Sequence, residues 1–344
     1  MRLTGAVARF VRARPGLREP LREVLTRVGR HRPGPRNDIM LISARRSGST
    51  WLMELLGTQP GMRYVDEPCE QFYYRRHGLR TGLEGVLPVM DSKLVSVAEA
   101  DADHYRTFFS DPKATRIHGP YDPTRPTFHF STDRRVLKIV NATALAQWLD
   151  DQRLGFDMVY LLRHPVPTVV SMAASVALRA EANLRHEGFV ARYLTEEQVR
   201  LGWDLLRDGS PLQRFALDWC LDSIVPFRAV ADQGRDWTVL TYEELSLSPR
   251  QTVALLTERL GLAEPDRLLE QLRVPSQSTA QGRLDVLAKE DSLQRVSRWR
   301  DKVDPHDVRA IHEVVDHFGI DAYGPDSAIA KPRWLHFAHT VGGS

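Results

Sequence analysis

One short stretch, residues 39–52, constrains the fold of this chain more than any other. It begins with four consecutive apolar residues, 39–42, as a strand buried inside a parallel sheet requires. A small basic loop follows, and from residue 50 to residue 56 apolar side chains recur at helical spacing. A strand, a tight loop and a helix start together direct several backbone N–H groups at one point, which suits an anion. We therefore predict an α/β fold with an anion-binding loop.

The side chains of this loop also suit phosphate or sulfate. Gly48 allows close approach of the backbone, and Arg46 adds a permanent positive charge. Ser49 and Thr50 supply hydroxyl groups. The loop is not a Walker A motif, because Ser49 stands where that motif has its lysine. An ordinary strand–turn–helix with a polar turn is the alternative interpretation.

Length and composition limit the class of protein. A chain of 344 residues with 42% hydrophobic residues can bury the core of one large α/β domain or of two smaller ones. Its two cysteines do not make a disulfide framework, which favours a reducing compartment. No apolar run approaches the length needed to cross a bilayer. We expect a soluble, cytoplasmic protein.

Positive charge is concentrated at the N-terminus. Residues 1–36 hold ten arginines and two acids, a net charge of +8, whereas the whole chain carries +3. Apolar residues recur on one helical face of this segment, which predicts a basic amphipathic arm ending in a linker over residues 31–35. The arm either lies on an anionic membrane surface or packs on the protein itself. We expect no nucleic-acid partner. The predicted domain then covers residues 37–325, with a C-terminal tail over residues 326–344.

Two further predicted strands carry candidate catalytic residues. The strand over residues 62–65 runs into Glu67, and the carboxyl ends of neighbouring strands share one crevice, so Glu67 is expected beside the anion loop. The strand over residues 135–140 sets Lys138 inside an apolar run, where an ammonium needs a compensating anion. In the alternative interpretation, Glu67 caps the next segment or pairs with an arginine, and Lys138 reaches out to the end of the sheet.

The clearest buried strand, over residues 158–162, ends at Arg163. A helix expected from about residue 166 places Ser171 two turns further on. A Walker B strand would end in an aspartate that holds Mg²⁺, so this arginine counts against an ATP- or GTP-hydrolysing site. Residues 69–134 read as irregular and residues 180–232 as helices. The last strand and its exit lie over residues 237–245, and a helix over 249–260 ends at Gly261.

Taken together, these segments resemble the sulfotransferase superfamily. Its 5′-phosphosulfate loop reads Lys/Arg-Ser-Gly-Ser/Thr-Ser/Thr and then an aromatic or apolar residue, which residues 46–51 match at every position. Its 3′-phosphate signature is an apolar strand, Arg-Asp-Pro, and a serine eight residues after the arginine. Arg163 and Ser171 match this signature, while His164 replaces the aspartate. The arginine form of the loop is common among carbohydrate-type and bacterial members.

The resemblance implies a set of residues that bind the nucleotide. Tyr242 corresponds to a tyrosine that approaches the adenine, and residues 297–300 are similar to a late Trp-Arg segment that helps close over the nucleotide. For this last segment, a solvated basic helix is the competing interpretation. The implied nucleotide-binding residues are Arg46, Ser47, Gly48, Ser49, Thr50, Trp51, Arg163, Ser171, Tyr242, Arg298 and Arg300.

The same resemblance implies the catalytic residues. Carbohydrate-type members carry a Glu-Pro where this chain has Glu67, and that glutamate is the usual candidate for general base. Lys138 corresponds to a lysine that contacts the sulfuryl group or the bridging oxygen, and Arg46 would assist at the leaving phosphate. Many cytosolic members place a histidine base two residues after the lysine. This chain has Val140 there, which strengthens the assignment of Glu67.

The implied fold is a P-loop-like, doubly wound parallel sheet flanked by helices. The implied reaction moves a sulfuryl group from 3′-phosphoadenylyl sulfate (PAPS) to an acceptor hydroxyl on a glycan, a glycolipid, another lipid or a small molecule, leaving adenosine 3′,5′-bisphosphate (PAP). No metal is expected, and His312 and His317 are wrongly spaced for the HExxH zinc motif. The alternatives are a P-loop nucleotide kinase or hydrolase, and a non-catalytic protein that binds nucleotide or a membrane surface.

Overall fold

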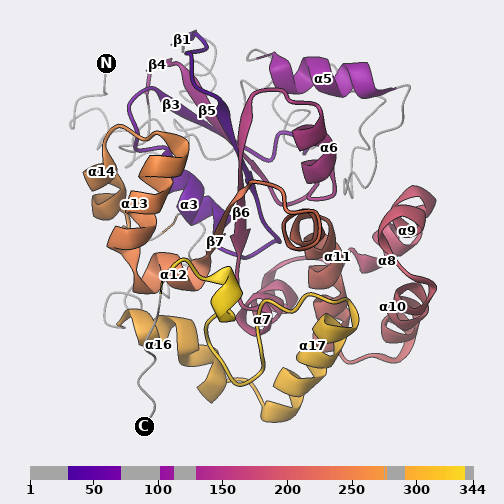
Figure 1. The fold of residues 1–344 in the computed structure, drawn as a ribbon. Coiled ribbons are helices and arrows are strands. Elements are labelled where there is room, and N and C mark those ends of the chain that lie inside the picture. The colour runs from indigo at the N-terminus through magenta and orange to yellow at the C-terminus, as the bar shows by residue number, and fades with distance from the viewer. Residues whose placement is uncertain (1–29, 71–100, 112–128, 275, 277–290, 338–344) are drawn as a thin grey trace, which may run out of the picture.

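The computed structural model describes residues 30–70, 101–111, 129–274, 276 and 291–337. Residues 1–29 of the predicted arm therefore lie outside the described residues, as do residues 71–100 and 112–128 of the segment predicted to be irregular. In the described part, a central sheet is covered on both faces by helices (Figure 1). This arrangement confirms the predicted α/β fold class.

The central sheet has five strands in the order β3-β5-β2-β6-β7, and every neighbouring pair is parallel. The strands span Asp38–Ile42 (β2), Met62–Asp66 (β3), Arg134–Ile139 (β5), Phe156–Leu162 (β6) and Thr238–Thr241 (β7). The five predicted strands are thus confirmed. Because β2 lies in the middle and the chain passes from it to both sides of the sheet, the loop after β2 opens into the crevice at the carboxyl ends.

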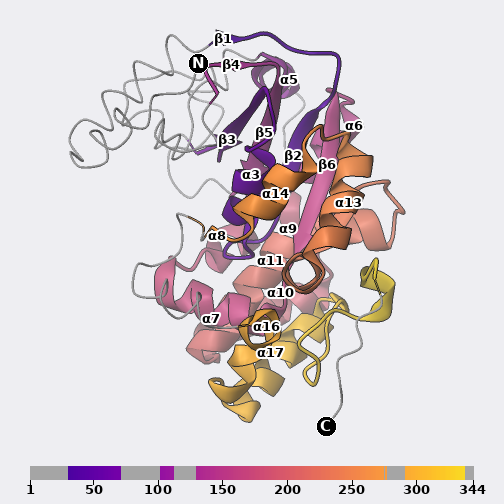
Figure 2. The same ribbon diagram turned by 90° about the vertical axis from the view of Figure 1, so that its left-hand side faces the viewer.

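Alternate residues of β2 face opposite layers of the core. Ile39 and Leu41 belong to one hydrophobic cluster, and Met40 and Ile42 belong to the other. The first cluster is covered by α3, α13 and α14, and the second mainly by α6, α7 and α11 (Figure 2). All four side chains are fully buried, which explains why the sequence of this strand is continuously apolar rather than alternating.

The described part of the chain also forms α-helices and two short 3-10 turns. They span Ser49–Leu56 (α3), Ala102–Ser110 (α5), Leu145–Asp151 (α6), Pro165–Ser175 (α7), Ala180–Leu184 (α8), Glu187–Tyr193 (α9), Glu196–Asp208 (α10), Pro211–Ala231 (α11), Tyr242–Leu247 (α12), Pro249–Leu260 (α13), Pro265–Gln271 (α14), Ser292–Ser297 (α16) and Pro305–His317 (α17), with short 3-10 turns over Arg298–Asp301 (η4) and Pro332–Trp334 (η5). Helix α13 ends at Gly261 in the left-handed conformation, as predicted.

Three regions differ from the sequence interpretation. Helix α5 lies within the segment predicted to be irregular, because its Tyr105, Phe108 and Phe109 are buried against the core. Strand β1, Arg30–His31, occupies the start of the predicted linker and pairs with β4, Ser131–Thr132. The pairing of β1 with β4 joins residues about a hundred positions apart, which local composition does not report.

The third difference is the C-terminal boundary. Trp334, in the predicted tail, is buried and its ring centroid lies 4.8 Å from that of Phe227. The backbone N–H groups of His336 and Phe337 both donate to the Glu244 carboxylate. The packed body of the protein therefore continues to at least residue 337 rather than ending at residue 325.

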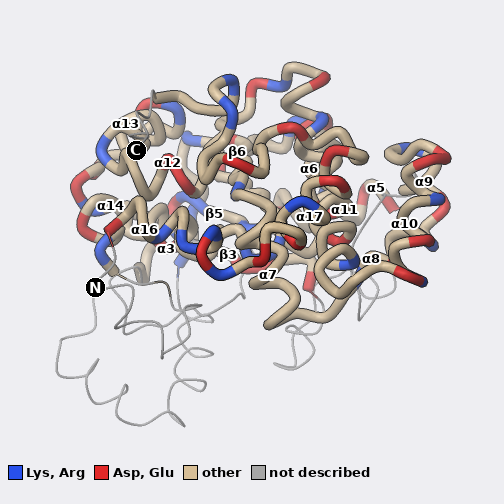
Figure 3. The backbone as a smooth tube through the Cα atoms, turned by 90° about the horizontal axis from the view of Figure 1, so that it is seen from below, with Lys and Arg blue, Asp and Glu red and all other residues tan. Residues whose placement is uncertain are grey.

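Charged residues of both signs are interspersed over the described helices (Figure 3). Within the residues that the structure describes, no helix is long and apolar enough to cross a membrane.

Candidate active site

The loop between β2 and α3 has an unusual backbone that its sequence explains. Arg46 and Gly48 both have positive φ, at 66° and 94°, and Gly48 is the N-cap of α3. A Cβ atom on Gly48 would lie 2.8 Å from Cδ2 of Tyr242, closer than side-chain atoms approach one another. Glycine is therefore required at this position for two reasons: its positive φ disfavours other residues, and the Tyr242 ring occupies the space that a Cβ atom would need. Ser47 and Ser49 are buried, and Thr50 is half-buried.

Three segments far apart in sequence meet at this loop. Nε of Arg46 donates to the Ser171 hydroxyl on α7 at 3.1 Å, and Nη1 of Arg163 donates to the Arg46 carbonyl at 2.9 Å. Cζ of Arg163 lies 4.2 Å from the ring centroid of Tyr242, and the rings of Trp51 and Tyr242 are 5.6 Å apart. The structure thus brings six of the predicted nucleotide-binding residues into one continuous cluster: Arg46, Gly48, Trp51, Arg163, Ser171 and Tyr242.

His164, which replaces the aspartate of the signature that this sequence resembles, takes the N-cap position of α7. Its Nδ1 atom accepts the N–H of Val166, as an aspartate oxygen does at an N-cap. The imidazole is fully buried, and burial lowers its pKa to about 3, so the ring stays neutral and Nδ1 remains an acceptor. The substitution therefore preserves the helix start that follows Arg163.

Trp299 connects the late basic segment to this region. Its ring stacks on His164 with centroids 4.5 Å apart, and it is buried. The guanidinium of Arg300 lies 5.7 Å from the Trp299 centroid and donates to the Asp326 carbonyl. Arg298 is half-buried on η4. Neither of the contacts described for Arg300 reaches the anion loop, so its contact with nucleotide remains a prediction.

On the other side of β2, Lys138 forms an ion cluster with two carboxylates. Its Nζ atom lies 2.6 Å from Asp66 Oδ1 and 2.9 Å from Glu67 Oε1, and its side chain is 7% exposed. Burial disfavours the ammonium, but the Asp66 and Glu67 carboxylates outweigh that effect and raise the pKa of Lys138. The anion that a buried lysine requires is therefore supplied by the end of β3.

Glu67 is held by the end of β5 as well as by Lys138. Its carboxylate accepts the backbone N–H groups of Val140 and Asn141, each at 3.1 Å. Its backbone has φ of 51°, a conformation that non-glycine residues seldom adopt. Burial raises the pKa of the Glu67 carboxyl, against the opposing effect of Lys138. Two backbone N–H groups and one ammonium thus fix the orientation of a carboxylate whose pKa is raised by burial, and its role as general base stays a prediction.

The sequence interpretation did not include Arg45, which anchors the loop to helix α11. This arginine is buried and donates to Asp218 at 2.5 Å, to Asp222 at 3.0 Å and to the Ala177 carbonyl at 3.0 Å. Asp218 and Asp222 lie one turn apart inside the long apolar helix α11. That pair of buried acids was the available signal, because buried carboxylates require a cation.

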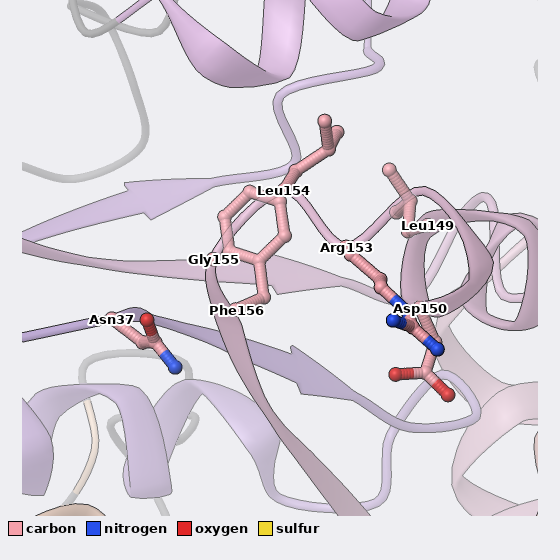
Figure 4. Close-up of a pocket in the computed structure, with 7 residues that line it drawn as sticks. All are labelled: Asn37, Leu149, Asp150, Arg153, Leu154, Gly155 and Phe156. Carbon is pink, nitrogen blue, oxygen red and sulfur yellow. The ribbon is translucent and has the colours of Figure 1, made fainter.

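The pocket shown in Figure 4 lies elsewhere. It is lined by Asn37, Leu149, Asp150, Arg153, Leu154, Gly155 and Phe156. Asn37 precedes β2 and Phe156 begins β6, so this pocket is at the amino ends of the strands, opposite the loop cluster. Among the described residues, no group of three or more histidine, cysteine or acidic side chains is arranged to hold a metal ion.

No family profile and no curated protein sequence matches this chain. Among solved structures, the sulfotransferase domain of the Synechococcus PCC 7002 olefin synthase matches at 19% identity and a TM-score of 0.42, covering 85% of this chain and 98% of that one. Mouse sulfotransferase SULT7A1 complexed with PAP matches at 15% identity and a TM-score of 0.38, covering 87% and 88%.

Sulfotransferase STF1 from Mycobacterium tuberculosis matches at 15% identity and a TM-score of 0.40, covering 88% of this chain and 80% of that one. Each of the three proteins is named as a sulfotransferase, the superfamily whose motifs this sequence resembles.

Proposed function

We propose that this protein is a sulfotransferase that uses PAPS as sulfuryl donor. One observation carries the proposal: the loop after β2, the tip of β6 with α7, and the exit of β7 meet through direct contacts of Arg46, Arg163, Ser171 and Tyr242. Two arginines from two strand tips, a serine hydroxyl and an aromatic ring are together suited to a nucleotide with two separate phosphate groups.

In the proposed complex, residues 46–51 hold the 5′-phosphosulfate through backbone N–H groups and the start of α3. Arg163 and Ser171 hold the 3′-phosphate. Because Arg46 already lies within hydrogen-bonding distance of Ser171, a single small bisphosphate can reach both the loop and α7. The adenine is placed against Tyr242 and Trp51, whose rings lie together beside Gly48. Arg298 and Arg300 are proposed to approach the nucleotide from η4.

For the transfer itself, we assign Glu67 as general base. It accepts the proton of the acceptor hydroxyl as the oxygen attacks sulfur, and the bond from sulfur to the bridging oxygen of PAPS breaks. Negative charge then builds on the leaving 5′-phosphate of PAP. Lys138, Arg46 and the N–H groups of the loop stabilise that charge.

The donor can be identified without knowing the acceptor. PAP is expected to raise the melting temperature in proportion to the logarithm of its concentration, because a ligand that binds only the folded state stabilises it by mass action. ATP with Mg²⁺ serves as the comparison, since a nucleotide kinase or hydrolase would respond to it instead. Stabilisation by ATP–Mg²⁺ without stabilisation by PAP would reject the sulfotransferase assignment.

The acceptor is proposed to be a hydroxyl on a glycan, glycolipid, other lipid or small molecule. Transfer of radiolabelled sulfate from PAPS to members of each class would identify it. Cytoplasmic location and contact of residues 1–36 with a membrane surface are further proposals. Binding of the full chain and of a chain lacking residues 1–29 to anionic vesicles tests the second, with loss on deletion expected.

A further inference from the structure

A chain of direct contacts leads from the anion loop to Glu67 by a route that avoids the sheet. It begins at the buried pair of Arg45 and Asp218, described above. The same Oδ2 atom of Asp218 that accepts from Arg45 also accepts the backbone N–H of Arg179 at 3.0 Å. Arg45 in turn donates to the Ala177 carbonyl, so the segment joining α7 to α8 is held at two points.

Arg179 extends this route to the end of β5. Its Nη1 atom donates to Oδ1 of Asn141 at 2.7 Å. The amide of Asn141 is also held from its other end, because its Nδ2 atom donates to Oε2 of Glu70 at 2.7 Å. The backbone N–H of Asn141 then donates to Glu67 Oε2. Thus the side chain of Asn141 is clamped between a cation and a carboxylate while its backbone holds the candidate base.

These contacts of Asn141 bear directly on the orientation of the Glu67 carboxylate. Glu67 depends on two consecutive N–H groups, those of Val140 and Asn141, at a point where β5 has already ended. Such backbone is free to turn unless side chains fix it, and Asn141 is the residue at that point with contacts on both sides. Asn141 Oδ1 is also the only hydrogen-bond acceptor that the described part of the chain offers to the Arg179 guanidinium.

We propose that Arg179 is a positioning residue for Glu67: by holding the side chain of Asn141, it fixes the backbone N–H groups that orient the Glu67 carboxylate. The catalytic meaning of this role rests on the proposed function, whereas the positioning itself is a property of the folded chain. The other groups that act on the Glu67 carboxyl are the Lys138 ammonium on β5, the Asp66 carboxylate on β3 and the backbone N–H of Val140, and the Cys69 thiol and the Glu70 carboxylate lie in the following turn; substitution of Arg179 removes none of these groups.

The first test needs no substrate. Side-chain carboxyl carbons of labelled glutamate are titrated by NMR, and the Glu67 signal is assigned by its disappearance in Glu67→Gln. Loss of hydrogen bonds to a carboxylate raises its pKa, so Arg179→Gln is expected to move the Glu67 midpoint up by about 0.5–1 pH unit. Arg185→Gln, which removes an exposed arginine paired with Glu181, is the matched control and should leave the midpoint unchanged.

Asn141→Ala removes the same link from its other side. It should produce the same shift, and the double variant should shift the midpoint no further than either single one, because both act through one contact. Additive shifts, or no shift in Arg179→Gln, would overturn the proposal. If Arg179→Gln does not fold, Arg179→Lys, which keeps the positive charge but not the planar guanidinium, is measured in its place with the same expected shift.

The second test uses turnover. Arg179→Gln should lower kcat about 10-fold with an unchanged KM for PAPS, and by less than about 2-fold when Glu67 is already glutamine. An equal loss in both backgrounds would mean that Arg179 acts independently of Glu67, and would contradict the proposal. Full turnover in Glu67→Gln alone would instead reject Glu67 as base, while the NMR titration would still decide whether Arg179 positions it.

Discussion

The guanidinium of Arg163 lies over the ring of Tyr242, with Cζ 4.2 Å from the ring centroid. The residues that follow each of them are also joined, because the Glu243 carboxylate accepts the backbone N–H of His164 at 3.1 Å. Two contacts, one between side chains and one between a carboxylate and a backbone N–H, therefore join the ends of β6 and β7. Tyr323 donates a further hydrogen bond to Glu243, at 2.8 Å, which ties the C-terminal segment to the same point. A nucleotide bound here would meet a surface that is already organised.

Arg163→Ala is expected to weaken binding of PAP about 10–100-fold, because it removes charge-assisted contacts to the 3′-phosphate. Binding of adenosine 5′-monophosphate, which lacks that group, should change much less. Isothermal titration calorimetry with both nucleotides measures the difference. Arg207→Ala, at an exposed arginine on α10, is the control. An equal loss for the two nucleotides would show that Arg163 acts by supporting the loop through the Arg46 carbonyl.

Glu67→Gln is expected to lower kcat roughly 10²–10⁴-fold with little change in affinity for PAP, because glutamine cannot accept the acceptor's proton. Burial raises the pKa of Glu67, so turnover of the wild type should fall as pH decreases through a value above that of an ordinary carboxyl. The residual activity of Glu67→Gln should lack this acidic decline. Glu181→Gln is the control at an exposed glutamate. A retained acidic decline in the variant would assign it to another group.

Gly48→Ala separates backbone strain from the contact with Tyr242. Its φ of 94° penalises alanine by about 1–2 kcal/mol. The new Cβ would also meet the tyrosine ring at 2.8 Å, and accommodating it is expected to cost about 1–3 kcal/mol more. Gly234→Ala is the matched control, since Gly234 has φ of 60° and no atom within 4 Å of an added Cβ.

Chemical denaturation gives the stability of both glycine variants, and calorimetry gives their affinity for PAP. Gly48→Ala should be the less stable of the two and should alone lose affinity. Equal stability and equal affinity would show that Tyr242 moves aside without consequence.

Because His164 is buried, we expect the free energy of unfolding of this protein to depend on pH. Burial lowers its pKa from 6.5 to about 3, so between these values the unfolded chain binds a proton that the folded chain does not. The contribution of His164 is therefore fully present above pH 6.5 and is lost as pH falls towards 3, by about 1.4 kcal/mol per pH unit.

His164→Asn keeps an acceptor at the N-cap but does not titrate. It should be less stable than wild type at pH 7, because it loses the stacking on Trp299, and the difference should shrink as pH is lowered. Urea unfolding between pH 7 and pH 4 measures both curves. Parallel curves would contradict a neutral, buried imidazole.

Local patterns in the sequence were sufficient to predict the strands of the sheet and the loop after β2. Each of the five predicted strands forms, because a strand buried on both faces must be continuously apolar and is bounded by turn residues. Lys138 was expected to need an anion, and Asp66 and Glu67 provide it. Helix α5 was not predicted, although its buried residues Ala102, Tyr105, Phe108 and Phe109 recur at helical spacing, which was a local signal for an amphipathic helix.

The sequence by itself determined which residues stand at the strand tips, because strand length and direction follow from local apolar runs. Only the tertiary structure decided which of these residues meet. Arg45 and Asp218 are 173 positions apart, Asn141 and Arg179 are 38 apart, and no local pattern names such partners. The close approach of Gly48 to Tyr242 is of the same kind. Periodicity reports that a side chain is buried, whereas its partner is set by how separate layers pack against one sheet.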